Sequence, residues 1–217
     1  MVSAALCLGL DAAYWKPVQS GVEPETDTEC VRRLTGLSTE HFFGETYKLS
    51  EPMSPHASAA IDGVTIDLDR FQLPSVSQSH LIVEGAGGLL VPLNDKHLMI
   101  DLIEQLALPV VVVARSGLGT LNHTLLTVGQ LRERGLHVVG VVMNGEPHAS
   151  NRAAIEHYGQ VRVIAEIPPL GELTKASINT AFSYFEANRE NSGEQLSNLA
   201  SLHPDENRRT PAAGQAR

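Results

Sequence analysis

Short apolar runs rich in β-branched residues recur along the chain, and helix-length patterns separate them. The runs cover residues 13–18, 80–86, 109–116, 138–144 and 161–168. The middle runs are apolar at consecutive positions, as expected for strands of a parallel sheet that is covered on both faces. Strands that alternate with helices in this way predict an α/β fold with a mostly parallel sheet and helices on both faces.

The segments between the runs carry helical patterns. We expect helices at residues 2–10, 27–35, 56–62, 97–107, 121–134, 149–158 and 174–188. A chain of 217 residues with 42% hydrophobic content suits one domain with one sizeable core. We place that domain at residues 1–189 and predict that the polar segment 190–217 is a mostly disordered tail.

The charge balance limits the classes of partner. Sixteen basic and twenty-five acidic side chains give a net charge of −9, which disfavours nucleic acid and anionic membrane surfaces. No apolar run approaches the roughly 18 residues of a spanning helix. Cys7 and Cys30 form no CxxC pattern, which favours free thiols in a reducing compartment. We therefore expect a cytoplasmic protein with neither nucleic acid nor membrane as its partner.

One of only four lysines, Lys16, stands at the end of the first apolar run, in the stretch KPVQSG. An ammonium in that place is costly unless it reaches solvent, a carboxylate or an anionic ligand. A lysine that simply extends into solvent is the ordinary interpretation. The hydroxyl of Ser20 and the turn at Gly21 favour the alternative interpretation, in which the Lys16 ammonium binds a phosphate or carbamate oxygen. Parallel sheets bind ligands beyond the carboxyl ends of their strands.

Two carboxylates are candidates for binding a divalent cation. Glu84 ends the run LIVEGAGG, where glycines let the backbone approach a phosphate closely and the carboxylate can reach a metal. A salt bridge at a strand end is the alternative. Asp27 opens a predicted helix, where an acidic residue favours the helix dipole. It could equally be a second magnesium ligand, but for the residue taken alone the helix-start interpretation is favoured.

Further polar groups follow the later runs. In SGLGTLNHTLLT a glycine loop leads into a helix, whose free backbone amides suit a carboxylate or a phosphate. Asn144, at the end of GVVMN, either pairs with an adenine edge or only terminates its strand. Because all five strand ends should lie at one edge of the sheet, we expect these groups to share a crevice.

Six stretches together resemble the dethiobiotin synthetase family over residues 2–173. In chain order they are KPVQSG, EPMSPHASA, VEGAGGLLVPL, GLGTLNHTLLT, GVVMN and AEIPPL. The resemblance implies a doubly wound sheet of the P-loop NTPase type and a homodimer. It also implies a reaction in which Mg²⁺ and ATP, with carbon dioxide or bicarbonate, close a ureido ring on 7,8-diaminopelargonic acid.

The same resemblance implies roles for individual residues. Lys16 would be the catalytic residue, stabilising the carbamate and the charge that develops during attack on the γ-phosphate. Asp27 and Glu84 would be the magnesium ligands. The substrate contacts would be Ser20, Leu118, Gly119, Thr120 and Asn122, the last four from the partner subunit of the dimer. The nucleotide contacts would be Asp27, Glu84, Gly85, Ala86, Gly87, Asn144, Gly145, Pro168, Pro169 and Leu170.

The sequence departs from the family pattern at its beginning. The family starts with a strand and a phosphate-binding loop that ends in Gly-Lys-Thr, and no Gly-Lys-Ser or Gly-Lys-Thr occurs here. We expect Met1 to be an internal start, the chain as given to bind nucleotide weakly, and two strand edges to lie open where the central strand belongs. The alternatives are a non-enzymatic truncated homologue or pseudoenzyme, and a domain like that of the cobyrinic acid synthetase amidotransferases.

Overall fold

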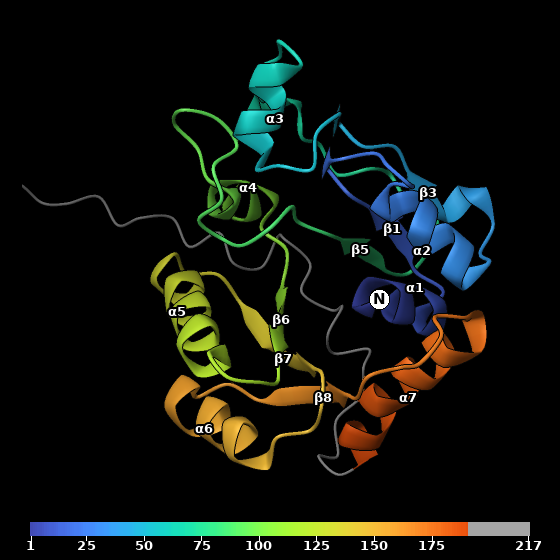
Figure 1. The fold of residues 1–217 in the computed structure, drawn as a ribbon, viewed down its shortest axis with the longest axis vertical. Helices are drawn as coiled ribbons and strands as arrows, with labels where there is room; N and C mark the ends of the chain where they lie inside the picture. The colour runs from blue at the N-terminus through green and yellow to red at the C-terminus, as the bar shows by residue number, and fades with distance from the viewer. Residues whose placement is uncertain (191–217) are drawn as a thin grey trace, which may run out of the picture.

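Helices and parallel strands alternate along residues 1–190, the part of the chain that the computed structural model describes (Figure 1). The helices are α1 (Val2–Leu10), α2 (Asp27–Thr35), α3 (Pro55–Ile61), α4 (Met99–Leu106), α5 (Thr120–Glu133), α6 (Ala149–Gly159) and α7 (Lys175–Glu190). The strands are β1 (Ala13–Trp15), β2 (Val18–Ser20), β3 (Phe42–Phe43), β4 (Tyr47–Leu49), β5 (Leu81–Val83), β6 (Val110–Arg115), β7 (Val138–Asn144) and β8 (Val163–Ile167). The predicted α/β class is therefore confirmed.

The predicted helices match the observed ones within two residues at each end, and α2 shows why. Its N-cap Thr26 accepts a hydrogen bond from the Glu29 amide, and the Glu29 side chain accepts one from the Thr26 amide. Gly36 ends the helix in the left-handed conformation. Both signals are legible in the sequence as a capping box and a terminal glycine.

The prediction of one strand over residues 13–18 is wrong. β1 ends at Trp15 and β2 begins at Val18, so Lys16 and Pro17 lie between two strands. Pro17 has no backbone N–H to donate to a ladder. Its carbonyl accepts instead from the amides of Thr46 and Tyr47, which directs β2 into a separate pairing with β4. The short strands β3 and β4 were not expected from the sequence.

The strands form two three-stranded parallel sheets and one parallel pair. The orders are β3-β1-β5, β6-β7-β8 and β2-β4. Within residues 1–190, β5 and β6 each have a strand partner on one side only. No strand among residues 1–190 joins β5 to β6, so the two three-stranded sheets are separate in their hydrogen bonding.

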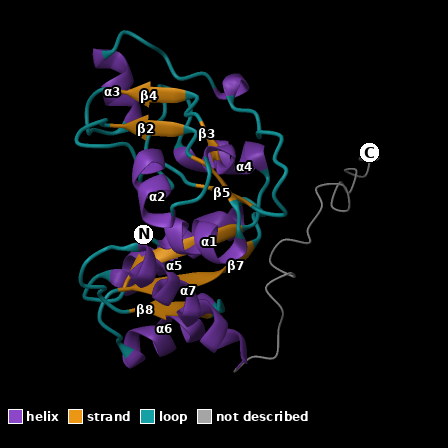
Figure 2. Ribbon diagram, turned by 90° about the vertical axis from the view of Figure 1, so that its right-hand side faces the viewer, coloured by secondary structure: helices purple, strands orange, loops and turns teal. Residues whose placement is uncertain are grey.

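Helices α1 and α7 join the two sheets through a shared core. Figure 2 shows α1 between the part of the fold that carries β2 to β5 and the part that carries β7 and β8. Tyr14 from β1 and Val142 from β7 belong to one buried cluster with side chains of both helices. The members from α1 and α7 are Val2, Ala4, Ala5, Cys7, Ile178, Ala181, Phe182 and Phe185. The first sheet is thus held to the second by helix packing.

The sequence predicted no membrane-spanning helix and a polar tail at residues 190–217. Across residues 1–190, no helix has the length and the apolar character needed to cross a membrane. The predicted tail at 190–217 lies, apart from Glu190 at the end of α7, outside the described residues.

A substitution at Gly9 tests the contact between α1 and α7. A Cβ atom there would lie 2.2 Å from Cγ of Phe182, so we expect Gly9→Ala to lower the free energy of unfolding by about 1–3 kcal/mol through overpacking. The matched control is Gly129→Ala in α5, where a Cβ atom would have no neighbour within 4 Å. The control should raise stability by up to about 1 kcal/mol, because alanine is the better helix former. Urea unfolding measures both variants, and equal effects would contradict the packing.

Candidate functional site

The ammonium group of Lys16 is the centre of the site. It lies 2.6 Å from Oδ2 of Asp27 and 3.2 Å from Oε1 of Glu84, and it donates to the carbonyl of Gly85 at 3.3 Å. The Lys16 side chain is only 6% exposed, whereas those of Asp27 and Glu84 are 47% and 32% exposed. The structure therefore brings these three predicted residues together, and the buried cation has the partners that its burial requires.

Asp27 reaches Lys16 because a buried amide side chain fixes the start of α2. The side-chain oxygen of Gln19 accepts from the Asp27 amide at 3.1 Å, and its nitrogen donates to the Gly21 carbonyl at 2.8 Å. Gln19 is 5% exposed and belongs to β2. It therefore ties the end of β2 to the first residue of α2. This role of Gln19 was not predicted, because a glutamine in the polar stretch KPVQSG is not distinctive in the sequence.

Glu84 is held by neighbours from two other elements. Its amide donates to the carbonyl of Trp15 at 3.0 Å, which continues the pairing of β5 with β1. Its carboxylate oxygen Oε2 accepts from the hydroxyl of Tyr14 at 3.1 Å and from the hydroxyl of Ser3 in α1. Neither donor was predicted, because Tyr14 stands within an apolar strand and Ser3 within an apolar helix.

The Glu84 carboxylate also affects the pKa values of two buried side chains, Tyr14 and Cys7. Burial, reinforced by the charge of Glu84, raises the pKa of Tyr14 well above its ordinary value. Burial and the same charge raise the pKa of the Cys7 thiol from 9.0 to about 12. Tyr14 therefore remains a hydrogen-bond donor, and Cys7 remains a neutral and unreactive thiol.

A cavity of about 440 Å³ opens beside the Lys16 ammonium. Five of the predicted site residues line it, namely Lys16, Ser20, Asp27, Ala86 and Gly87. The other lining residues were not predicted; they are Gln19, Pro52, Met53, Ser54, Pro55 and Val91. Four of these belong to the stretch EPMSPHASA, whose place in the resemblance was the only signal for them.

Two details of the cavity wall suit an anionic or polar ligand. The Ser20 hydroxyl oxygen is buried and has no hydrogen-bond partner. Gly87 adopts a φ of +81°, which favours glycine, and a Cβ atom there would lie 2.9 Å from a methyl carbon of Val91. The backbone of the loop after β5 thus remains accessible at this point.

The remaining predicted residues lie at the end of the second sheet. Asn144 is paired in register with Arg115 of β6 and Ile167 of β8, and the Gly145 amide donates to the Ile167 carbonyl at 2.9 Å. Pro168, Pro169 and Leu170 follow β8 directly. The structure therefore brings Asn144 and Gly145 together with the end of β8. These residues are not among those that line the 440 Å³ cavity beside Lys16.

The glycine loop before α5 follows the carboxyl end of β6, and its residues differ in solvent exposure. Gly119 is the N-cap residue of α5, and Thr120 is buried with its hydroxyl 3.2 Å from that of Thr124. Leu118 is fully exposed at 108%, and Asn122 is also exposed. None of the four predicted contacts in this loop lines the cavity beside Lys16.

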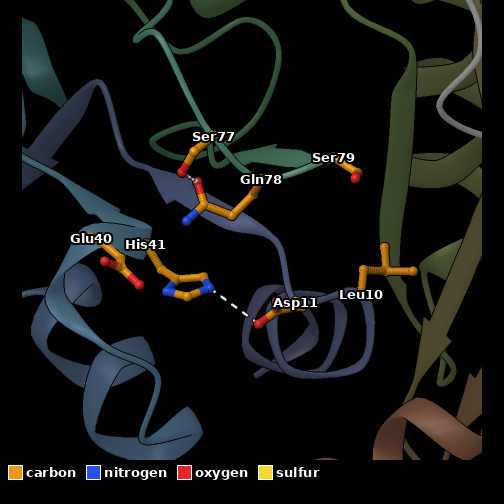
Figure 3. A pocket seen from close by; sticks show the side chains of 7 residues that line it. All are labelled: Leu10, Asp11, Glu40, His41, Ser77, Gln78 and Ser79. Atoms are coloured by element: carbon orange, nitrogen blue, oxygen red, sulfur yellow. Dashed lines mark hydrogen bonds and ion pairs between the residues drawn. The ribbon is translucent and has the colours of Figure 1, made fainter.

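A second cavity, of about 320 Å³, lies at the opposite ends of the strands of the first sheet (Figure 3). Its lining comes from Leu10, Asp11, Glu40, His41, Ser77, Gln78 and Ser79. The buried imidazole of His41 lies 3.1 Å from a carboxylate oxygen of Asp11 and 3.1 Å from the hydroxyl of Ser38. These contacts join the end of α1 to the start of β3. No sequence pattern indicated this cavity.

The oxygen donors beside Lys16 fit a magnesium ion held partly by the protein. Asp27 and Glu84 supply two carboxylates on one ammonium, and the described residues contain no group of three or more acidic, histidine or cysteine side chains that suits a metal. Magnesium is commonly bound by one or two carboxylates together with substrate phosphates and water. The Asp27 carboxylate lines the cavity, and the Glu84 carboxylate lies next to it on the Lys16 ammonium although Glu84 is not a lining residue, which matches that pattern.

Comparison with known proteins identifies one family model and several proteins that are similar to this chain. A family model described as an AAA domain matches residues 1–177. A protein of Paramagnetospirillum magneticum is 51% identical over 178 residues, which are 82% of this chain and 85% of that protein. One of Bradyrhizobium diazoefficiens is 47% identical over 180 residues, 83% of this chain and 85% of its own. One of Brucella ovis is 45% identical over 181 residues, with the same two shares. Each of these proteins is named ATP-dependent dethiobiotin synthetase BioD.

The raised pKa of Cys7 predicts a loss of stability at alkaline pH. Between 9.0 and about 12 the unfolded thiol is ionised while the folded one keeps its proton. The unfolded state then binds fewer protons, so the free energy of unfolding falls as pH rises, by up to about 1.4 kcal/mol per pH unit for this group. Urea unfolding from pH 8 to 11 should show a shallower decline in Cys7→Ala than in the unmodified chain. Equal declines in the two proteins would contradict the raised pKa of Cys7.

Proposed function

Since the chain belongs to the dethiobiotin synthetase family, we propose that the cavity beside Lys16 is its active site. The reaction is the Mg²⁺- and ATP-dependent carboxylation and ring closure of 7,8-diaminopelargonic acid, which yields dethiobiotin, ADP and phosphate. The observation that carries the site assignment is the buried Lys16 ammonium, which bridges two carboxylates at the wall of a cavity.

Lys16 is proposed as the catalytic residue because the reaction gathers negative charge where its ammonium lies. A carbamate forms on one substrate amine, and its oxygen then attacks the γ-phosphorus of ATP. Both species are anionic, and a fixed cation in a site of low dielectric lowers the energy of such a transition state. The two carboxylates hold the ammonium in place before the anion arrives.

Asp27 and Glu84 are proposed to hold magnesium. Bound magnesium neutralises charge on the β- and γ-phosphates during phosphoryl transfer. The chain's own contribution is orientation, since Gln19 fixes the amide of Asp27 while the pairing of β5 with β1 fixes the backbone of Glu84. Gly85, Ala86 and Gly87 are proposed to follow the phosphates, and the left-handed Gly87 supports a close approach of the backbone.

The other contacts are proposed from the family pattern together with their positions. Ser20 is a substrate contact in this proposal, supported by its buried and unpartnered hydroxyl. Asn144, Gly145, Pro168, Pro169 and Leu170 form the adenine pocket, supported by the common end of β7 and β8 where they lie. Leu118, Gly119, Thr120 and Asn122 contact the substrate carboxylate of a partner subunit.

A homodimer in the cytoplasm completes the proposal. Leu118 and Leu126 are 108% and 59% exposed on the loop before α5 and on that helix. Large apolar side chains on one segment favour contact with another protein surface. A second copy of the chain is the partner that would also bring the Leu118 loop to the substrate of its neighbour.

Substitution of Lys16 tests the catalytic assignment. In the full natural chain, ATP hydrolysis that requires both the diamine and bicarbonate should fall at least about 100-fold in Lys16→Ala, because a charge-stabilising group is removed. Lys48→Ala, at an exposed position of β4, is the matched control and should keep the unmodified rate. Circular dichroism should show both variants folded. Unmodified turnover in folded Lys16→Ala would refute the role, and no substrate-dependent hydrolysis in any folded protein would refute the function.

Substitution of Leu118 tests the dimer. Sedimentation equilibrium should give the mass of two chains for the unmodified protein and a shift toward one chain for Leu118→Asp, because a carboxylate would be buried in the interface. Ile61→Asp, at a 60% exposed position of α3, should leave the mass unchanged. If Leu118→Asp and the unmodified protein have equal masses, the loop does not form the interface.

A further inference from the structure

The two oxygens of the Glu84 carboxylate have partners of different kinds. Oε1 accepts from the Lys16 ammonium at 3.2 Å. Oε2 accepts from the Tyr14 hydroxyl at 3.1 Å and from the Ser3 hydroxyl. One oxygen therefore faces a charged group at the cavity wall, and the other faces two neutral hydroxyls beneath it.

The Tyr14 hydroxyl has a fixed position because its whole residue is buried in a paired strand. Tyr14 is 0% exposed, and its backbone pairs with Phe42 on one side and Ile82 on the other. Its ring also lies 6.3 Å from the Phe42 ring, centre to centre. The amide of Glu84 is tied to the carbonyl of Trp15, the residue after Tyr14. Donor and acceptor thus belong to the same two adjacent strands.

The Lys16 ammonium is a less permanent partner for Glu84. Its shortest contact is the 2.6 Å one to Asp27, and it lies at the wall of the cavity. An anion bound there competes with Glu84 for this ammonium, since a lysine has three donors and no fixed fork geometry. Oε1 then becomes free, while Oε2 keeps its hydroxyl donors.

We propose that Tyr14 is a positioning residue for Glu84, an inference that rests on the proposed metal site. Its hydroxyl holds Oε2, so Oε1 keeps facing the position of the Lys16 ammonium at the cavity wall when a cation replaces the ammonium as its partner. Groups that hydrogen-bond to a metal ligand orient that ligand, and removing one typically weakens metal binding 10- to 100-fold. A purely structural role, in which Glu84 only satisfies a buried hydroxyl, does not require an effect on metal affinity.

The first measurement is the affinity for Mn²⁺, a paramagnetic probe for the magnesium site, in the presence of ADP. Electron paramagnetic resonance of free Mn²⁺ gives the affinity in the full natural chain. Tyr14→Phe should weaken Mn²⁺ binding about 10-fold. The matched control is Tyr47→Phe, which also removes a buried hydroxyl, one that accepts from the Asp67 amide at 2.9 Å. The control should lower the melting temperature comparably and leave the Mn²⁺ affinity unchanged.

The same titration in a Glu84→Gln background separates the inference from the metal site itself. Glu84→Gln alone should weaken Mn²⁺ binding, and adding Tyr14→Phe should then have little further effect, because both act through one carboxylate. Unchanged affinity in Glu84→Gln, or no Mn²⁺ binding by the unmodified chain, would overturn the metal site and the inference with it. If Glu84→Gln weakens binding but Tyr14→Phe does not, or does so equally in both backgrounds, only the role of Tyr14 is overturned.

Discussion

The ion pairs of one buried lysine organise the end of the first sheet where we propose the active site. Lys16 contacts a carboxylate from the start of α2 and another from the end of β5, so three distant segments meet on one ammonium. A cation in this place is stable because its three donors have three acceptors, including the carbonyl of Gly85. Both acids are partly exposed while the lysine is buried, and Asp27 also lines the cavity.

The helix α1 connects this site to the rest of the fold. Its apolar residues pack in the cluster that joins the two sheets, and its polar Ser3 contacts the carboxylate of Glu84. Since the strand order is interrupted between β5 and β6, the relative position of the sheets depends on α1 and α7 rather than on a continuous ladder of hydrogen bonds. The first sheet carries Lys16 and Glu84, while the second carries Asn144 and the residues after β8.

Patterns within short stretches of the sequence predicted the helices and the charged residues around Lys16. The helices were placed closely because caps, glycine stops and apolar periodicity act within a few residues of each boundary. Lys16, Asp27 and Glu84 were found because charged groups at strand and helix ends are unusual enough to require a partner. The sequence did not predict the roles of Tyr14, Ser3 and Gln19. The role of a buried hydroxyl or amide depends on its hydrogen-bond partner, which only the fold brings close.

The sequence by itself determined the α/β class, the family and the charged residues of the site, because strand and helix periods and the types of charged residue are properties of the chain alone. Only the tertiary structure decided that Lys16 bridges both acids, that the strand at residues 13–18 breaks at Pro17, and that the sheet divides between β5 and β6. Those outcomes depend on contacts between segments far apart in the chain. Such contacts follow from packing and from the pairing of strand edges, which no local pattern specifies.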